Sequence, residues 1–269
     1  MKILKKSHSV IVLLVNFILF FGVANQALAE DGPGNNSQAV MDCEKAIILD
    51  PNDALAYYCR GVAHNKQSAY RSAVQDFDKA IELNPKYIGA YNNRGDAYGK
   101  LREFEHAIRD YSMAIELKPD DALTYFARAT AYSELGMYEQ VIEDCDKATN
   151  LMPEFALPYY YRGIAYGKRR DYQQAIKEYS KAIKLAPKYA KAYFGRGSVY
   201  GNLKDYRQAI RDFDKAIDLE PKDAMSYYNR GIAYGRVGDF KREIKDSKAS
   251  AKLGYKPAQD FLKSKGISW

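Results

Sequence analysis

Six arginines recur at a constant interval of 34 residues, and two kinds of chemistry could explain them. They are Arg60, Arg94, Arg128, Arg162, Arg196 and Arg230. A row of guanidinium groups facing water would bind phosphate or nucleic acid. The same groups facing the interior would need carboxylate partners, because a buried charge without a partner is costly. The acidic residues around them decide between these two interpretations.

An acidic residue follows each arginine by sixteen positions. These residues predict a ladder of structural ion pairs: Arg60–Asp76, Arg94–Asp110, Arg128–Asp144, Arg162–Glu178, Arg196–Asp212 and Arg230–Asp246. The pairs neutralise the stripe, so we do not expect nucleic acid as a partner. Asp42 stands in the same acidic position one interval earlier, where no arginine precedes it, and we expect it to reach Arg60.

Two helices and a turn would position each pair. In residues 88–121, Tyr91, Gly95 and Tyr98 recur at the spacing of one helix face, and Ala107 and Ala114 mark a second helix. Arginine and acid each lie about eight residues from the intervening turn, so they should meet across two antiparallel helices. A proline closes each unit: Pro51, Pro85, Pro119, Pro153, Pro187 and Pro221. Neither helix alone can bury its stripe, so neighbouring units must stack.

This pattern resembles the tetratricopeptide repeat over about residues 39–253. In one unit its slots are filled by Tyr193, Arg196, Gly197, Tyr200, Ala209, Phe213 and Pro221. Two departures are systematic, since tyrosine replaces the family's tryptophan and arginine replaces its leucine. The resemblance implies an all-α fold, a right-handed superhelix of stacked antiparallel helix pairs (an α-solenoid). It also implies a concave inner face lined by the first helix of each unit.

The first 29 residues have the features of a secretory signal. Three lysines precede an apolar run from Val10 to Ala24, and Ala27-Leu28-Ala29 has the small-x-small pattern of a cleavage site. The run is shorter than the ~20 residues of a membrane span. We therefore predict export to a bacterial periplasm or cell envelope, or secretion. An uncleaved segment is the alternative, and it would give the only membrane contact.

The remaining chain divides into four predicted segments. Residues 30–36 are a flexible linker, and residues 37–53 are a half repeat with only its second helix. Six repeats occupy residues 54–255, and a capping helix and tail occupy 256–269. The half repeat leaves an apolar helix face partly uncovered, which would permit a homodimer through this first helix.

Composition gives little support for catalysis or metal binding. Residues 1–29 hold three lysines and no acid, so 38 basic and 34 acidic residues leave a mature net charge of +4. His64 and His106 lie in different units without further ligands at metal spacing. We expect no cofactor and no enzyme activity.

Cys43 and Cys59 flank a turn and could form a disulfide or serve as small core residues. Cys145 is predicted to lie in the core.

The surface predicted to bind partners is the concave groove. The residue after each repeated tyrosine should face it: Tyr58, Asn92, Phe126, Tyr160, Phe194 and Tyr228. Four positions further on, the apolar members are Val62, Ile164 and Ile232. Lys66, Lys100, Lys168 and Arg236 could form a basic rim. Glycines beside that rim suggest close approach by a ligand or a helix: Gly99, Gly167, Gly201 and Gly235. Packing of the aromatic rings on neighbouring units is the alternative.

These features predict an exported, non-enzymatic adaptor or scaffold. It would hold protein or peptide segments in the aromatic groove. A glycan-binding module of the cell envelope and a self-assembling structural protein remain alternatives.

Overall fold

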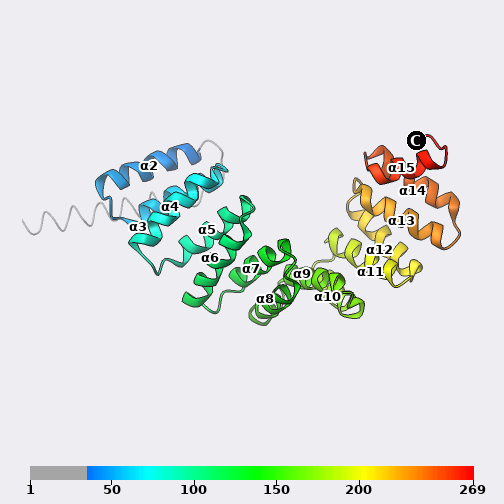
Figure 1. The fold of residues 1–269 in the computed structure, drawn as a ribbon, viewed down its shortest axis with the longest axis horizontal. Coiled ribbons are helices and arrows are strands. Elements are labelled where there is room, and N and C mark those ends of the chain that lie inside the picture. Colours follow the sequence, from blue (N-terminus) through cyan, green and yellow to red (C-terminus); the bar gives the residue numbers. More distant parts are fainter. Residues whose placement is uncertain (1–34) are drawn as a thin grey trace, which may run out of the picture. The chain divides into compact units, whose positions relative to one another are not determined.

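A computed structural model describes residues 35–269, in which the secondary structure is entirely helical. The helices follow one another as antiparallel pairs (Figure 1). The chain divides into two compact units between Ala131 and Tyr132. The all-α stack of helix pairs that the sequence predicts is confirmed. The predicted signal, residues 1–29, lies outside the described residues and stays a prediction.

The first unit contains the half repeat and the first repeats. Its helices are α2 (Asn35–Leu49), α3 (Ala54–Lys66), α4 (Tyr70–Leu83), α5 (Ile88–Lys100), α6 (Phe104–Leu117) and most of α7 (Ala122–Glu134). α3 packs on α4 and α5 on α6, while α2 packs on α3. Since α2 begins at Asn35, the predicted linker 30–36 overlaps the helix by two residues.

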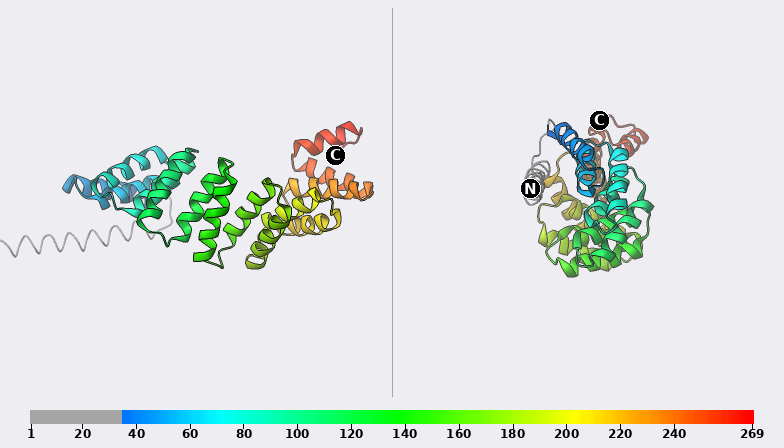
Figure 2. Two further views of the ribbon diagram at one scale, coloured as in Figure 1. Left: turned by 60° about the horizontal axis from the view of Figure 1, so that its bottom comes forward. Right: turned by 90° about the vertical axis from the view of Figure 1, so that its left-hand side faces the viewer.

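The second unit contains the remaining repeats and the terminal helix. Its helices are α8 (Tyr138–Leu151), α9 (Ala156–Lys168), α10 (Tyr172–Leu185), α11 (Ala190–Asn202), α12 (Tyr206–Leu219), α13 (Ala224–Arg236), α14 (Phe240–Lys252) and α15 (Lys256–Ser264). Figure 2 shows these pairs from two further sides. α15 has Pro257 in its first turn and packs on α14 through the fully buried Ala258 and Leu262. It is the capping helix that the sequence predicts.

In four of the repeats a glycine on the first helix lets an aromatic ring of the second helix come close. A Cβ atom at Gly61 would lie 2.6 Å from the ring of Phe77, and one at Gly95 would lie 2.7 Å from Tyr111. Glycine is therefore needed for this contact, although it weakens a helix interior by about 1 kcal/mol relative to alanine. The rings pass between alanines that are almost fully buried. The core is thus a column of aromatic rings and small residues inside each unit.

Aspartates at the starts of several helices fix the short turns. Asp171, Asp205 and Asp239 each accept a hydrogen bond from the backbone N–H three residues later. Such N-caps satisfy amides that a helix start leaves without a partner. Among the described residues, no helix has the length and apolar character that crossing a membrane requires.

Candidate functional site

Five of the six predicted arginine–carboxylate pairs are present within the units. Their shortest nitrogen–oxygen distances are 2.6 Å (Arg60–Asp76), 2.6 Å (Arg94–Asp110), 2.6 Å (Arg162–Glu178), 2.7 Å (Arg196–Asp212) and 2.8 Å (Arg230–Asp246). The acids are buried and the arginine side chains are 10–23% exposed. Arg128 and Asp144 lie in different units, so their pairing stays a prediction.

Five of the six arginines donate a hydrogen bond to a second acceptor, which the sequence analysis missed. The Nη1 atom of each points to the residue sixteen positions before the arginine, on the second helix of the preceding repeat. Arg94 donates to Asp78 at 2.6 Å, Arg230 to Asp214 at 2.7 Å, Arg128 to Ser112 and Arg196 to Ser180 at 2.9 Å each, and Arg162 to Asp146. Each of these arginines therefore joins neighbouring repeats. The acceptors recur at a fixed interval, so a search in both directions along the sequence could have found them.

The expectation for Asp42 is wrong. Asp42 accepts hydrogen bonds from Gln38 and Lys45 on its own helix. Glu44, two residues later, is the acid that approaches Arg60, with Nη1 and Oε1 3.9 Å apart. The physical reason is helical geometry, since two residues along a helix turn a side chain to a different face.

The two departures from the family pattern belong together. The repeated tyrosine lies three residues before each arginine, and the guanidinium carbon lies 5.1–5.9 Å from the tyrosine ring centroid in all six repeats. An aromatic face attracts a cation at this separation. Hydrogen bonds to Asp76 and Asp212 raise the pKa values of Arg60 and Arg196, so both remain charged. The stripe is a neutralised part of the interior.

Four aromatic rings of the predicted groove pack against aromatic rings of other elements, within their own repeat or at the start of the next. The ring centroid of Tyr58 lies 5.9 Å from Phe77 and 4.7 Å from Tyr87. Tyr160 meets Tyr179 at 5.8 Å in the same way. Phe194 packs on Phe213 and Tyr228 on Tyr255. In these four repeats the ring at position five of the first helix is thus a packing contact and only partly accessible.

An open pocket of about 270 Å³ lies in the second unit, between α11 and α13. Ser198, Gly201 and Asn202 line it from α11, and Asn229, Ile232 and Arg236 line it from α13. Two of these residues, Ile232 and Arg236, were predicted to face a partner. Tyr206, Phe213 and Ala233 complete its wall. The amides were missed because they recur in too few repeats to form a pattern.

Several polar side chains of this pocket have hydrogen-bonding groups that no other described residue uses. Asn229 donates to the carbonyl of Met225 at 2.8 Å, which leaves its side-chain oxygen as an acceptor. Among the described residues, Asn202 makes no side-chain hydrogen bond and Arg236 no ion pair. Ile232 is 40% exposed. The pocket therefore combines amide and guanidinium donors with an apolar surface, which suits a peptide backbone or a carboxylate.

Gly201 in the pocket wall has no packing reason to be glycine. A Cβ atom at Gly201 or at Gly99 would meet no heavy atom within 4 Å. At Gly167 the nearest atom would be 3.8 Å away, an ordinary contact, whereas at Gly235 the carboxylate of Glu243 would be too close. Close approach of a helix therefore does not explain Gly99 and Gly201. Both leave bare helix backbone on the surface, and Lys100 beside Gly99 is exposed, as is Lys168 beside Gly167.

The cysteines and His64 lie within the packed interior or beside an ion pair. Cys43 and Cys59 pack together as buried free thiols, and hydrogen bonding to Cys59 together with burial raises the pKa of Cys43. Their disulfide stays a prediction. Cys145 is fully buried, as predicted. Nδ1 of His64 lies 2.9 Å from Asp76, within the first ion pair. No cluster of metal-ligating side chains occurs among the described residues.

Family comparison agrees with the repeat geometry. Models of the tetratricopeptide repeat match residues 54–87, 89–121, 122–155, 190–223 and 213–245, and a further TPR repeat model matches residues 168–204. The chain belongs to the tetratricopeptide repeat family. No curated protein sequence matches it.

Solved structures of other repeat proteins share the fold. MamA is 28% identical, with a TM-score of 0.57 over 64% of this chain and 94% of MamA. A tetratricopeptide repeat protein from Parabacteroides merdae is 21% identical, with a TM-score of 0.66 over 91% and 97% of the two chains. YrrB, described as a TPR protein with an unusual peptide-binding site, is 20% identical, with a TM-score of 0.60 over 68% and 95%. The last two likenesses concern the fold alone.

Proposed function

We propose that this tetratricopeptide repeat protein is a non-enzymatic interaction scaffold that binds a peptide segment of a partner protein. The observation that carries the proposal is the α11–α13 pocket. Arg236 and Asn202 present unused donors there, and Ile232 presents an apolar side chain. The peptide-binding site of YrrB supports the same class of function.

The pocket would hold a peptide by its main chain and one side chain. Amides of Asn202 and Asn229 can pair with peptide carbonyl and N–H groups, while Arg236 can pair with a carboxylate. The missing side chain at Gly201 would let the peptide backbone approach the helix. The repeats are already packed on one another, so binding would order few groups of the scaffold. Glycan binding is less well supported, because the rings at position five are occupied by contacts with other rings.

Selection from a random peptide library tests this function. Peptides that bind the chain lacking residues 1–29 would be measured by fluorescence anisotropy against Asn202→Ala and Arg236→Ala. We expect each variant to weaken binding about tenfold, the loss of one charge-assisted or buried hydrogen bond. Lys252→Ala, an exposed cation at the end of α14, is the matched control. Unchanged binding by both pocket variants would refute the proposal.

We also propose that the protein is exported to the periplasm or cell envelope. The support is the amino-terminal sequence: a basic start, an apolar run and the residues Ala27-Leu28-Ala29. Mass spectrometry of the protein from its native cells should find Glu30 as the first residue. A chain that begins at Met1 and is found in the cytoplasm would contradict export.

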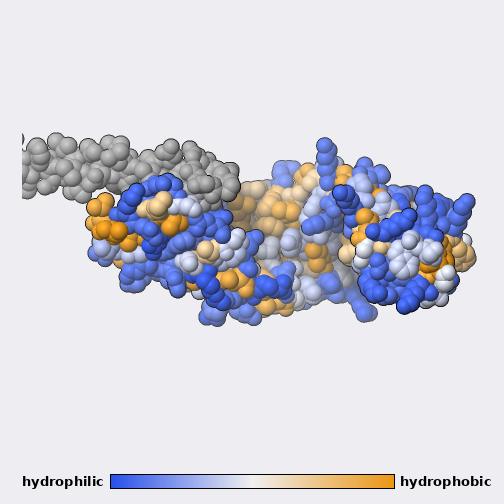
Figure 3. All heavy atoms as spheres, turned by 90° about the horizontal axis from the view of Figure 1, so that it is seen from above, coloured by the Kyte–Doolittle hydropathy of each residue, from blue (hydrophilic) through white to orange (hydrophobic). Residues whose placement is uncertain are grey.

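A second candidate function is self-assembly through α2. Met41 and Ile48 are 47% and 79% exposed and lie seven residues apart, on one helix face. The equivalent positions of the other second helices are polar or charged, such as Arg211 and Asp218 on α12. Figure 3 shows apolar surface gathered at the end of the described chain that α2 occupies. Sedimentation of wild type and Met41→Lys/Ile48→Lys would test this, and a monomeric wild type would exclude it.

A further inference from the structure

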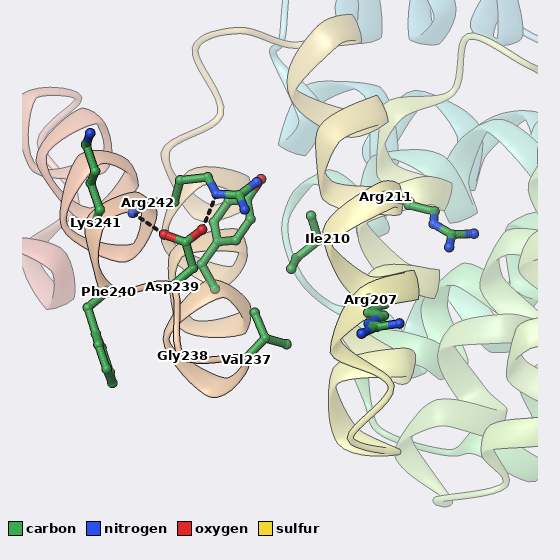
Figure 4. A pocket seen from close by; sticks show the side chains of 10 residues that line it. Arg207, Ile210, Arg211, Val237, Gly238, Asp239, Phe240, Lys241 and Arg242 are labelled. Carbon is green, nitrogen blue, oxygen red and sulfur yellow. Dashed lines mark hydrogen bonds and ion pairs between the residues drawn. The ribbon is translucent and has the colours of Figure 1, made fainter.

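A second cleft in the second unit has a different chemistry from the α11–α13 pocket. It lies between α12 and the turn that joins α13 to α14, and its volume is about 740 Å³ (Figure 4). Ile210 projects into it from α12, and Val237 faces it from the turn. Tyr234 and Phe240 add aromatic surface. The two sites share no lining residue, so the cleft is separate from the proposed peptide pocket.

Positive charge surrounds this apolar floor. Arg207, Arg211, Lys241 and Arg242 line the cleft, with Asp239 as its one acid. Asp239 is already engaged, because it accepts hydrogen bonds from the backbone and the guanidinium of Arg242. The guanidinium carbon of Arg242 lies 4.4 Å from the ring centroid of Tyr234, so this cation is also engaged. The remaining three cations are exposed and form no ion pair among the described residues.

At the equivalent place in the first unit, an ion pair joins the second helix of one repeat to the turn of the next. There Arg71, the counterpart of Arg207, donates to Glu103, the counterpart of Asp239. In the second unit, Glu139 and Arg169 form an ion pair at another equivalent place, with 3.3 Å between Nε and Oε1. At the α12 cleft, Arg242 has taken the acid, and aspartate is one methylene shorter than glutamate. Arg207 is left without the partner that its counterpart has.

Phe240 is exposed because the helix that covers its counterparts in other repeats is shorter here. Its counterparts Tyr172 and Tyr206 are partly buried against Val199 and Ala233 on the next first helix. α15 is the next first helix for Phe240, and it ends at Ser264, before the position that would cover the ring. Phe240 consequently remains 66% exposed. The cleft therefore has an uncovered aromatic ring beside three unpaired cations.

We infer that the cleft binds an acidic peptide segment that carries an apolar side chain. The apolar residue would enter between Ile210 and Val237, and the flanking carboxylates would pair with Arg207, Arg211 and Lys241. Arginine suits this task because its guanidinium can bind a carboxylate with two parallel hydrogen bonds. A flat anionic membrane would touch the outer cations but could not reach Ile210 inside the cleft. Charge complementarity and the recessed apolar floor together favour a peptide.

A short labelled peptide tests this inference directly. The probe is a fluorescein-labelled pentapeptide with a central phenylalanine and two glutamates on each side. It would be titrated with the chain that lacks residues 1–29. We expect Arg207→Glu/Arg211→Glu to weaken binding about tenfold or more, and Phe240→Ser to weaken it about threefold. The changed side chains are exposed, so thermal melting should show that the variants remain folded.

Matched controls distinguish the cleft from general attraction to a basic protein. Lys215→Glu alters an exposed cation on α12, one turn beyond Arg211 and outside the cleft, and should change the affinity less than about twofold. A probe with alanine in place of phenylalanine should bind more weakly. Equal losses with Lys215→Glu, or equal binding of the alanine probe, would overturn the inference. Vesicles of phosphatidylglycerol that bind more tightly than the probe, with the same dependence on Arg207 and Arg211, would also overturn it and indicate a membrane surface.

Discussion

Arginine does two different things in this molecule, and the ion-pair ladder and the α12 cleft show the difference. Arg162 in the ladder donates to Glu178 and to Asp146, and its side chain is 10% exposed. Arg207 in the cleft is exposed and forms no ion pair among the described residues. The residue type is the same, but the acceptors differ. A guanidinium with two fixed acceptors holds repeats together, whereas one without acceptors can bind a partner.

Removing a ladder arginine should have the largest effect on stability. Arg162→Leu leaves the carboxylate of Glu178 buried without its cation. Loss of one member of a buried pair costs about 3–5 kcal/mol, so the melting temperature should fall strongly. Arg207→Leu should change stability by less than about 0.5 kcal/mol, as expected for an exposed side chain. Urea unfolding of both variants measures the difference, and similar values would contradict the distinction between the two arginines.

Replacing both members of the same pair should restore much of the loss. Arg162→Leu/Glu178→Leu removes the unpaired charge and returns leucine to the position where the family pattern has it. A buried ion pair is often no better than apolar residues of similar volume, so we expect stability within about 1–2 kcal/mol of wild type. Asp146, which is exposed by half, can be solvated. A double variant as unstable as Arg162→Leu would show that the pair itself contributes the stability.

The ladder was predictable because it repeats. Arginine, acid and tyrosine each recur at one interval, so the sequence alone indicated which side chains meet, and the structure places five pairs at hydrogen-bonding distance. The packing of Tyr58 and Tyr160 against other rings was less predictable. The repeat spacing places these rings on the first helices, but how much of each ring stays accessible depends on the rings packed beside it, Phe77 and Tyr87 for Tyr58 and Tyr179 for Tyr160.

The α12 cleft could not have been predicted from the repeat. Its character depends on two departures that occur once: arginine at position 242, where the other repeats have serine, histidine or glutamine, and a terminal helix that ends before it covers Phe240. A search for periodic residues discards such features. The same holds for Asn202 in the α11–α13 pocket, while Asn229 has a single counterpart, Asn93. Repeated residues therefore describe the scaffold, and residues that break the repeat are where we expect recognition.

The Arg71–Glu103 ion pair of the first unit should contribute little to stability. Glu103→Gln removes the ion pair with Arg71, whose side chain is 70% exposed. Exposed pairs are worth about 0.2–1 kcal/mol, so the melting temperature should hardly change. The acidic probe should then gain weak binding at this place, which is detectable in a protein that also carries Arg207→Glu/Arg211→Glu. If the probe gains no binding, the free charge alone is insufficient, and the exposed ring of Phe240 is needed as well.

The smallest expected effect follows from rebuilding a bridge in the α12 cleft. Arg242→Gln frees Asp239 to pair with Arg207, as Glu103 pairs with Arg71, and should weaken binding of the acidic probe about threefold. Part of that loss would come from the missing cation. Arg242→Gln/Asp239→Asn has the same missing cation but no competing acid, so it should bind better than Arg242→Gln alone. Asparagine is also a good N-cap, which keeps the start of α14 intact. Equal affinities of the two variants for the probe would mean that Asp239 does not compete with the probe for Arg207. The Arg71–Glu103 ion pair would then not explain a difference in probe binding between the two units.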